Sequence, residues 1–127
     1  MYIDVYRCII FSEDIFVMLK VSDLPVRAGF TLLNRTGQAD RIVSSVYCCD
    51  LLSAVMGGAP AGSAWVTVMG NINVIAVSVL ADTACVIVAD GAEVEERALG
   101  KADEQGVTVL RSALPVFETA KIVDSLL

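Results

Sequence analysis

The second half of the chain alternates short apolar runs with longer segments of helical character. Three runs rich in Val, Ile, Ala and Leu predict strands, at residues 64–69, 85–89 and 107–110. Each run is almost wholly apolar rather than alternating, which is typical of strands covered on both faces. Because a helix is expected after each strand, the pattern predicts parallel strands joined by right-handed crossovers.

Two helices are expected between these strands, and they rest on different signals. Residues 71–82 are apolar at nearly every position, so periodicity cannot separate helix from strand, but their length and the opening Gly70 and Asn71 favour a buried helix. Residues 94–105 begin among acidic side chains, which suit the positive end of a helix dipole. Gly106 stands where a helix-ending glycine is expected.

A last helix is expected at the end of the chain. Pro115 fits its first turn, where the missing N–H of proline costs nothing. Val116, Ala120, Val123 and Leu127 then form one apolar stripe at helical spacing.

The first half of the chain predicts shorter elements. Strand formers are enriched at residues 2–11, 30–33 and 42–48, with a turn-rich loop at 34–40. Ser22 is expected to cap a short helix that Gly29 ends. Asp50 is expected to cap a helix at 51–56, which the glycine pair at 57–58 stops.

These elements predict a single α/β domain whose sheet is mainly parallel or mixed and is flanked by helices. The chain has 127 residues, which suits one domain and leaves little room for two. We expect the domain to span residues 18–127, with residues 1–17 as an N-terminal extension of uncertain status.

The composition limits where such a chain can reside. Apolar residues make up 56% and charged residues 19%, which excludes a disordered chain. No charged residue occurs at 51–81, but glycines and polar residues interrupt that stretch, leaving apolar pieces well short of the ~20 residues of a membrane helix. The four cysteines form no Cys-x-x-Cys pair, so neither a zinc site nor a disulfide framework is expected. We expect a soluble, cytoplasmic protein with no membrane span and with surplus apolar surface covered in a homodimer.

Charge and residue types exclude several kinds of chemistry. The net charge of −6 argues against a nucleic-acid partner, which needs clustered cations. The chain has no histidine, and its glycine-rich stretch at 57–62 lacks the Lys-Ser/Thr ending of a phosphate-binding loop. The acidic side chains at 93–104 are interleaved with Arg97 and Lys101, which indicates a solvated helix face rather than a metal or carboxylate-pair site. We therefore expect no catalytic residue, no metal and no cofactor.

Candidate ligand-binding residues lie in the loops that follow three of the predicted parallel strands. They are Gly70, Asn71 and Asn73, then Asp90 and Gly91, and then Arg111 and Ser112. Ligands bind at this edge of parallel sheets, and a helix N-terminus there favours an anion. One interpretation is a small polar site for a phosphate-bearing metabolite. The other is that an asparagine merely caps a helix and the Asp-Gly pair makes a turn.

Several stretches together carry a family resemblance. They are residues 45–57, 65–68, 73–77, 84–91, 106–110 and 117–120. In this order and spacing, over about residues 18–127, the chain resembles the DRTGG domain. The resemblance implies a fold like the N-terminal domain of HPr kinase. The family also occurs beside CBS-domain pyrophosphatases, in some phosphotransacetylases and as small stand-alone bacterial proteins, which this chain resembles most.

The chain departs from the family in two loops. The Asp-Arg pair and the Thr-Gly-Gly triplet of the family name correspond to Asn71-Ile72-Asn73 and Ala89-Asp90-Gly91. The lost arginine weakens the argument for an anion bound as in other members.

Three functions are compatible with the residues and the resemblance. The first is a non-catalytic regulatory module, acting as a homodimer, that senses a nucleotide or phosphorylated metabolite. The second is an accessory subunit that docks on a protein partner in a metabolic or redox complex. The third is an enzyme of phosphoryl- or acyl-transfer type, which the missing catalytic set disfavours.

Overall fold

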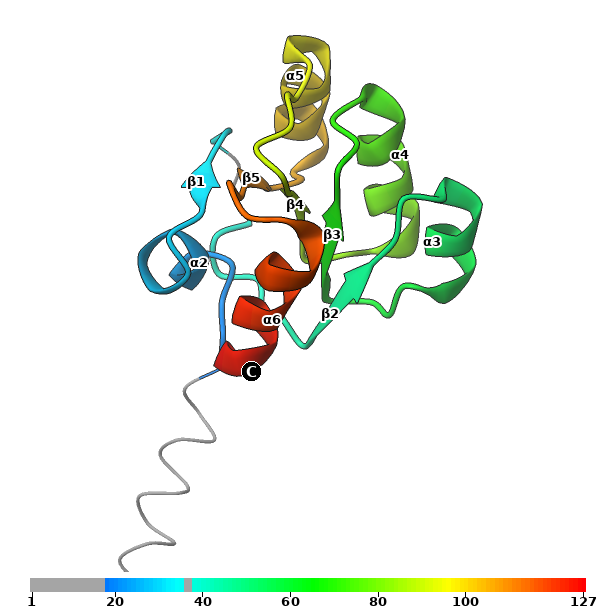
Figure 1. Ribbon diagram of the computed structural model, residues 1–127. Coiled ribbons are helices and arrows are strands. Elements are labelled where there is room, and N and C mark those ends of the chain that lie inside the picture. The colour runs from blue at the N-terminus through cyan, green and yellow to red at the C-terminus, as the bar shows by residue number, and fades with distance from the viewer. Residues whose placement is uncertain (1–17, 36–37) are drawn as a thin grey trace, which may run out of the picture.

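A five-stranded sheet forms the centre of the computed structural model, which describes residues 18–35 and 38–127. The strands are β1 Thr31–Leu32, β2 Ser45–Cys48, β3 Ser63–Thr67, β4 Cys85–Val88 and β5 Val109–Arg111. Their order across the sheet is β1-β5-β4-β3-β2 (Figure 1). Strands β2 to β5 are parallel, and β1 pairs antiparallel with β5. The sheet is therefore mixed, as the α/β prediction allowed.

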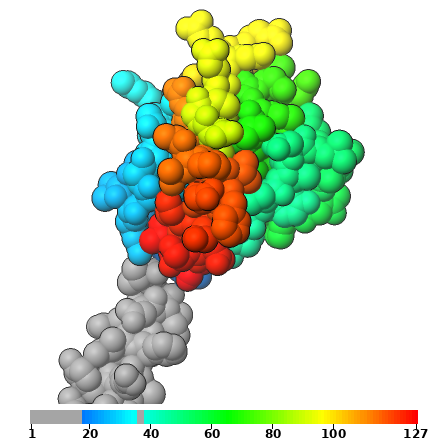
Figure 2. Space-filling model, in the orientation of Figure 1, coloured from blue at the N-terminus to red at the C-terminus, as the bar shows by residue number. Residues whose placement is uncertain are grey.

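Helices cover both faces of this sheet. They are α2 Asp23–Arg27, α3 Leu52–Gly58, α4 Ile72–Ala81, α5 Glu96–Gln105 and α6 Val116–Leu126. Figure 1 shows α3, α4 and α5 on one side of the sheet and α2 and α6 on the other. In Figure 2 the surface over α6 faces the viewer, with the described residues around α2 and β1 on one side and the β2–α3 region on the other.

Successive side chains along each strand point to opposite faces of the sheet, so a hydrophobic core forms on each face. Val66 of β3 and Ile87 of β4 pack in the cluster that contains Val123 of α6. Their neighbours Trp65 and Val86 point to the opposite face and pack with residues of α3, α4 and α5. Trp65 is fully buried, so the apolar strand residues are used on both faces, as their unbroken apolar runs predicted.

Both helices expected between the predicted strands are present. Helix α4 confirms the interpretation of residues 71–82 and ends at Asp82, whose φ of 58° lies in the left-handed region. Helix α5 ends at Gly106, with a φ of 74° that glycine adopts without strain. In α6 the stripe is correct at Val123, which is buried, but wrong at Leu127, which is 48% exposed.

Other local predictions need correction. Asp50 does not cap α3: the N-cap is Leu51, and the carboxylate of Asp50 bonds elsewhere. The glycine pair at 57–58 does not stop α3, since Gly57 and Gly58 form its last turn. Ser22 stands at the N-cap of α2, but its side chain makes no capping hydrogen bond. The expected strand at 2–11 lies outside the described residues.

Among the described helices, none combines the length and apolarity needed to cross a membrane.

Candidate functional site

The parallel strands place their following loops at one edge of the sheet, here called the carboxyl edge. It consists of residues 49–51, 68–73, 89–95 and 111–115, which include the start of α4 and the end of β5. The N–H of Gly91 donates to the carbonyl of Ser112 at 2.8 Å, and the N–H of Glu95 donates to the carbonyl of Gly70 at 2.9 Å. The structure therefore brings the three predicted loops side by side, as parallel topology requires.

Gly70 holds two of these loops in close contact. A Cβ atom at this position would lie 2.2 Å from the carbonyl oxygen of Glu93 and 2.7 Å from the Cα of Val94. Both are backbone atoms, so no side-chain rotation could relieve the overlap. The role of Gly70 is therefore to allow backbone contact between the loops after β3 and β4.

The two predicted asparagines have different roles. The Oδ1 atom of Asn71 accepts from the N–H groups of Asn73 at 3.0 Å and Val74 at 3.2 Å. Asn71 is therefore the N-cap of α4, as predicted by the interpretation that an asparagine in this loop caps a helix. The side chain of Asn73 is exposed in the first turn of α4, and it can reach a ligand at the positive end of the helix.

Asp90 and Gly91 form the turn after β4. Both have positive φ angles, 64° and 61°. The N–H of Asp90 donates to the carbonyl of Leu114 at 2.7 Å, which ties this turn to the loop after β5. The side chain of Asp90 is exposed and adds negative charge to the edge.

Ser112 and Arg111 also differ in how they are used. Ser112 is 2% exposed, and its Oγ lies 2.7 Å from the Oγ1 of Thr119 and accepts from the N–H of Leu114 at 3.1 Å. Its hydroxyl thus joins the loop to the start of α6. Arg111 is half-buried on β5, opposite Thr31 of β1.

Sequence reasoning missed Asp50 as a member of this edge. Its Oδ1 accepts from the Oγ1 of Thr67 at 2.6 Å and from the N–H of Val68 at 2.9 Å, so it joins the loops after β2 and β3. The available signal was its position directly after a strand that is parallel to the others.

The thiol of Cys48, at the end of β2, is weakly nucleophilic. Its pKa is raised, first by burial, then by the negative charge of Asp50 and then by Cys49, so the thiol stays protonated near neutral pH.

Negative charge predominates over the exposed part of the carboxyl edge. Asp50, Asp90 and Glu93 are exposed there, against the half-buried Arg111. A phosphate group is therefore favoured only near Arg111 and the start of α4, or together with a cation. Within the described residues, no group of three or more His, Cys, Asp or Glu is placed to hold a metal ion.

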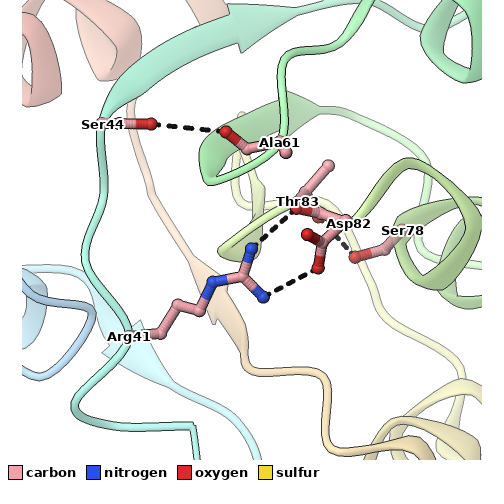
Figure 3. A network of polar contacts seen from close by, with 6 residues as sticks. All are labelled: Arg41, Ser44, Ala61, Ser78, Asp82 and Thr83. Carbon is pink, nitrogen blue, oxygen red and sulfur yellow. Dashed lines mark hydrogen bonds and ion pairs between the residues drawn. The ribbon is translucent and has the colours of Figure 1, made fainter.

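The opposite edge, here called the amino edge, is built from the segments that precede the parallel strands. It consists of residues 38–44, 59–62, 82–84 and 106–108. Figure 3 shows Arg41 reaching the end of α4, where Nη1 lies 3.0 Å from Asp82 Oδ1 and Nη2 donates to the Asp82 carbonyl at 2.9 Å. The buried hydroxyls of Ser78 and Thr83 hydrogen-bond to each other beside this pair. A polar cavity of about 140 Å³ lies beside these residues. The hydrogen bond from Arg41 to the Asp82 carbonyl provides a partner for a backbone carbonyl at the carboxyl end of α4.

Comparisons with known proteins agree with this architecture. The model of the DRTGG domain family matches residues 28–126. No curated protein matches the chain at a significant level. A similar solved structure comprises the CBS and DRTGG domains of the regulatory region of a Clostridium perfringens pyrophosphatase, in complex with its activator diadenosine tetraphosphate.

The likeness to that structure has a TM-score of 0.68 at 13% sequence identity. It covers 84% of this chain and 47% of the other, so this chain spans about half the length of that relative. At this identity the likeness establishes the fold. The family and the fold expected from the sequence are both confirmed.

Proposed function

The chain belongs to the DRTGG domain family, and we propose that it is a non-catalytic regulatory module that binds a nucleotide or phosphorylated metabolite and acts as a homodimer. The observation that carries the proposal is the fold shared with a pyrophosphatase regulatory region in complex with its activator, diadenosine tetraphosphate. That region contains CBS domains as well as a DRTGG domain, so its nucleotide binding is a property of the larger unit. The proposal transfers the regulatory role and the class of ligand, not the individual contacts.

The proposed binding site is the carboxyl edge, with Asn73 and Arg111 as the residues that contact the ligand. The amide of Asn73 is exposed at the first turn of α4, and Arg111 supplies the positive charge among the predicted site residues. Gly70, Asn71 and Ser112 belong to the same site, but they act by holding its loops in place. Since Asp90 opposes a bare anion, we expect modest affinity, which a divalent cation on the phosphate would increase.

Exposed apolar side chains support assembly of the module. Leu80 on α4 is 72% exposed and Phe117 on α6 is 66% exposed. Helices α4 and α6 cover opposite faces of the sheet, so these side chains belong to two separate surfaces, and either surface is suited to be the interface of a two-fold dimer. Light scattering at micromolar concentration should give twice the chain mass, and a monomer mass would contradict the homodimer.

The same apolar side chains favour one alternative, an accessory subunit in a complex with another protein. The alternatives differ in what the native host yields. Stoichiometric co-purification of one different protein that shields Leu80 or Phe117 would support the accessory role. Recovery of the chain alone as a dimer supports the regulatory module.

A thermal-shift screen of the full chain tests ligand binding directly. The probes are nucleotides including diadenosine tetraphosphate, acyl phosphates and coenzyme A esters, each with and without Mg²⁺. A ligand at 100 times its Kd adds about 2.7 kcal/mol to the free energy of unfolding. Absence of a shift with every class would contradict the ligand-binding role.

Two variants then locate the site. Asn73→Leu and Arg111→Ala should each weaken binding by at least about tenfold while the protein remains folded, because each removes a polar contact to the ligand. Arg27→Ala is the matched control, since Arg27 is an exposed arginine at the end of α2 and belongs to none of the loops of the carboxyl edge. Unchanged binding in both site variants would show that the ligand binds elsewhere.

A further inference from the structure

A second pocket opens near the amino edge, away from the proposed nucleotide site. Its volume is about 310 Å³, within the lower part of the range typical of small-molecule sites. Val21, Pro25 and Leu32 form apolar walls that come from the N-terminal segments and β1. Thr108, directly before β5, completes the pocket from the sheet.

The walls of this pocket are fixed by hydrogen bonds. Asn34 is 6% exposed; its Nδ2 donates to the carbonyl of Val107 at 2.7 Å, and its Oδ1 accepts from the N–H of Val109 at 2.8 Å. On the other side, the N–H of Ser22 donates to the carbonyl of Ala39 at 3.0 Å. The pocket is therefore formed before any ligand arrives, which lowers the entropic cost of binding.

Three polar side chains that make no hydrogen bond or ion pair with another described residue line the pocket. Thr108 is 2% exposed, and its hydroxyl has no hydrogen-bond partner in the described part of the chain. Ser22 makes no capping bond with its side chain. Arg35 is exposed at the pocket, and no ion pair joins it to another described residue. Buried polar groups are normally bonded, so the unpaired hydroxyl of Thr108 is a departure that calls for a partner.

The geometry points to a binding site for a small, planar, largely apolar molecule that carries one anionic group. Its ring system would lie against Val21, Pro25 and Leu32, and the anion would pair with the guanidinium of Arg35. Arginine suits this role because it is always charged and its planar fork matches oxyanions. A donor or acceptor on the ring would bond Thr108. This site is separate from the carboxyl edge, so each of the two proposals can fail without the other.

Two fluorescent probes test the inference on the full chain. 8-Anilino-1-naphthalenesulfonate has the planar ring and the anion, whereas N-phenyl-1-naphthylamine has the same ring system without the sulfonate. We expect one sulfonate probe to bind per chain. Arg35→Met should weaken its binding by at least about tenfold and leave the uncharged probe within twofold, because only the anion contacts Arg35. Arg27→Met is the charge-matched control and should change neither probe.

Ala39→Trp should abolish binding of both probes by filling the pocket, and a cooperative thermal melt shows that the variant is folded. Ala39 is exposed, so the larger side chain is tolerated. The competing apolar groove lies between α4 and α5 and is lined by Leu80 and Lys101. Probe fluorescence that survives Ala39→Trp and is lost in Leu80→Gln would place binding in that groove and overturn the inference. Absence of binding to the unsubstituted protein would overturn it as well.

Discussion

Both edges of the parallel sheet bond most of their buried polar groups, but among the described residues the amino edge leaves one hydroxyl beside a pocket without a hydrogen bond. At the carboxyl edge, most of the polar groups that sequence reasoning selected are engaged in holding adjacent loops together, as with Asn71 and Ser112. Near the amino edge, Arg41, Ser78 and Thr83 are also paired, but the buried hydroxyl of Thr108, beside a preformed pocket, has no hydrogen-bond partner among the described residues. Polar residues gathered by topology therefore indicate where loops meet, whereas unpaired polar groups beside a cavity indicate where a ligand can be accommodated.

This difference follows from how the edges are built. Successive parallel strands all end at the carboxyl edge, so the loops that follow them lie side by side and hydrogen-bond to one another. The pocket near the amino edge is enclosed by α2, β1 and the segment that follows β1, which do not belong to the parallel repeat. The function of each edge can therefore be tested separately.

The largest effect is expected from Gly70→Ala, which tests whether the carboxyl edge depends on backbone contact. The added Cβ would lie 2.2 Å from the carbonyl oxygen of Glu93, so the two loops must separate. We expect a loss of more than about 3 kcal/mol in the free energy of unfolding, measured with urea.

Gly100→Ala is the matched control for that change. Gly100 lies within α5, and a Cβ there meets no atom within 4 Å. Alanine should stabilise this helix by about 0.5–1 kcal/mol. Equal effects of the two substitutions would contradict the contact between the loops.

The next effect is a pH dependence of the free energy of unfolding, caused by the thiol of Cys85, which begins β4 next to the amino edge. Burial raises the pKa of its thiol from 9.0 to about 12. Below pH 9.0 the thiol is protonated in both states, and its stabilising contribution is complete. As the pH rises from 9.0 towards 12, the unfolded chain loses its proton first, so stability falls by up to about 1.4 kcal/mol per pH unit.

Comparison with Cys85→Ala isolates this contribution. The variant is less stable below pH 9 because a buried sulfur is removed, but at higher pH it lacks the decline that the thiol causes. The difference in unfolding free energy between the two proteins should therefore shrink by between about 1 and 2 kcal/mol from pH 9 to pH 10.5. A constant difference over this interval would show that the thiol is not buried in this way.

A smaller effect distinguishes the two asparagines of the carboxyl edge. Asn71→Ala removes the cap of α4 and should cost about 1 kcal/mol of stability. Asn73→Ala changes an exposed side chain and should alter stability by less than about 0.5 kcal/mol. Thermal unfolding of the two variants measures this, and a reversed order would contradict the assignment of the cap to Asn71.

The sequence was sufficient to predict the parallel part of the fold because each element carried a local signal. Apolar runs predicted β3, β4 and β5, and the opening Asn71 correctly favoured a helix for the segment that became α4. The adjacency of the three site loops followed from topology alone. The family resemblance was also carried by these segments, and the family match at residues 28–126 confirms it.

The features that could not be predicted from the sequence depend on contacts between segments far apart in the chain. Asp50 was predicted to cap α3, yet it bonds Thr67 and Val68, because the loop after β3 offers it better-placed donors. Asn34 was part of a turn-rich loop, and nothing local indicated that it would bond the backbone at Val109. The antiparallel pairing of β1, and with it the pocket, likewise depends on contacts between distant segments.

The most direct test of the contrast between the edges is the change in stability caused by removing one buried hydroxyl from each. Ser112→Ala removes a hydroxyl bonded to Thr119, and it should lower the free energy of unfolding by about 1–2 kcal/mol. Thr108→Val removes an unpaired hydroxyl at nearly constant shape, and it should leave stability unchanged or raise it by up to about 1 kcal/mol. Urea unfolding of both variants should therefore give effects of different sign or a near-zero value for Thr108→Val. A loss at Thr108 as large as that at Ser112 would contradict the account, because it would show that both hydroxyls are equally bonded.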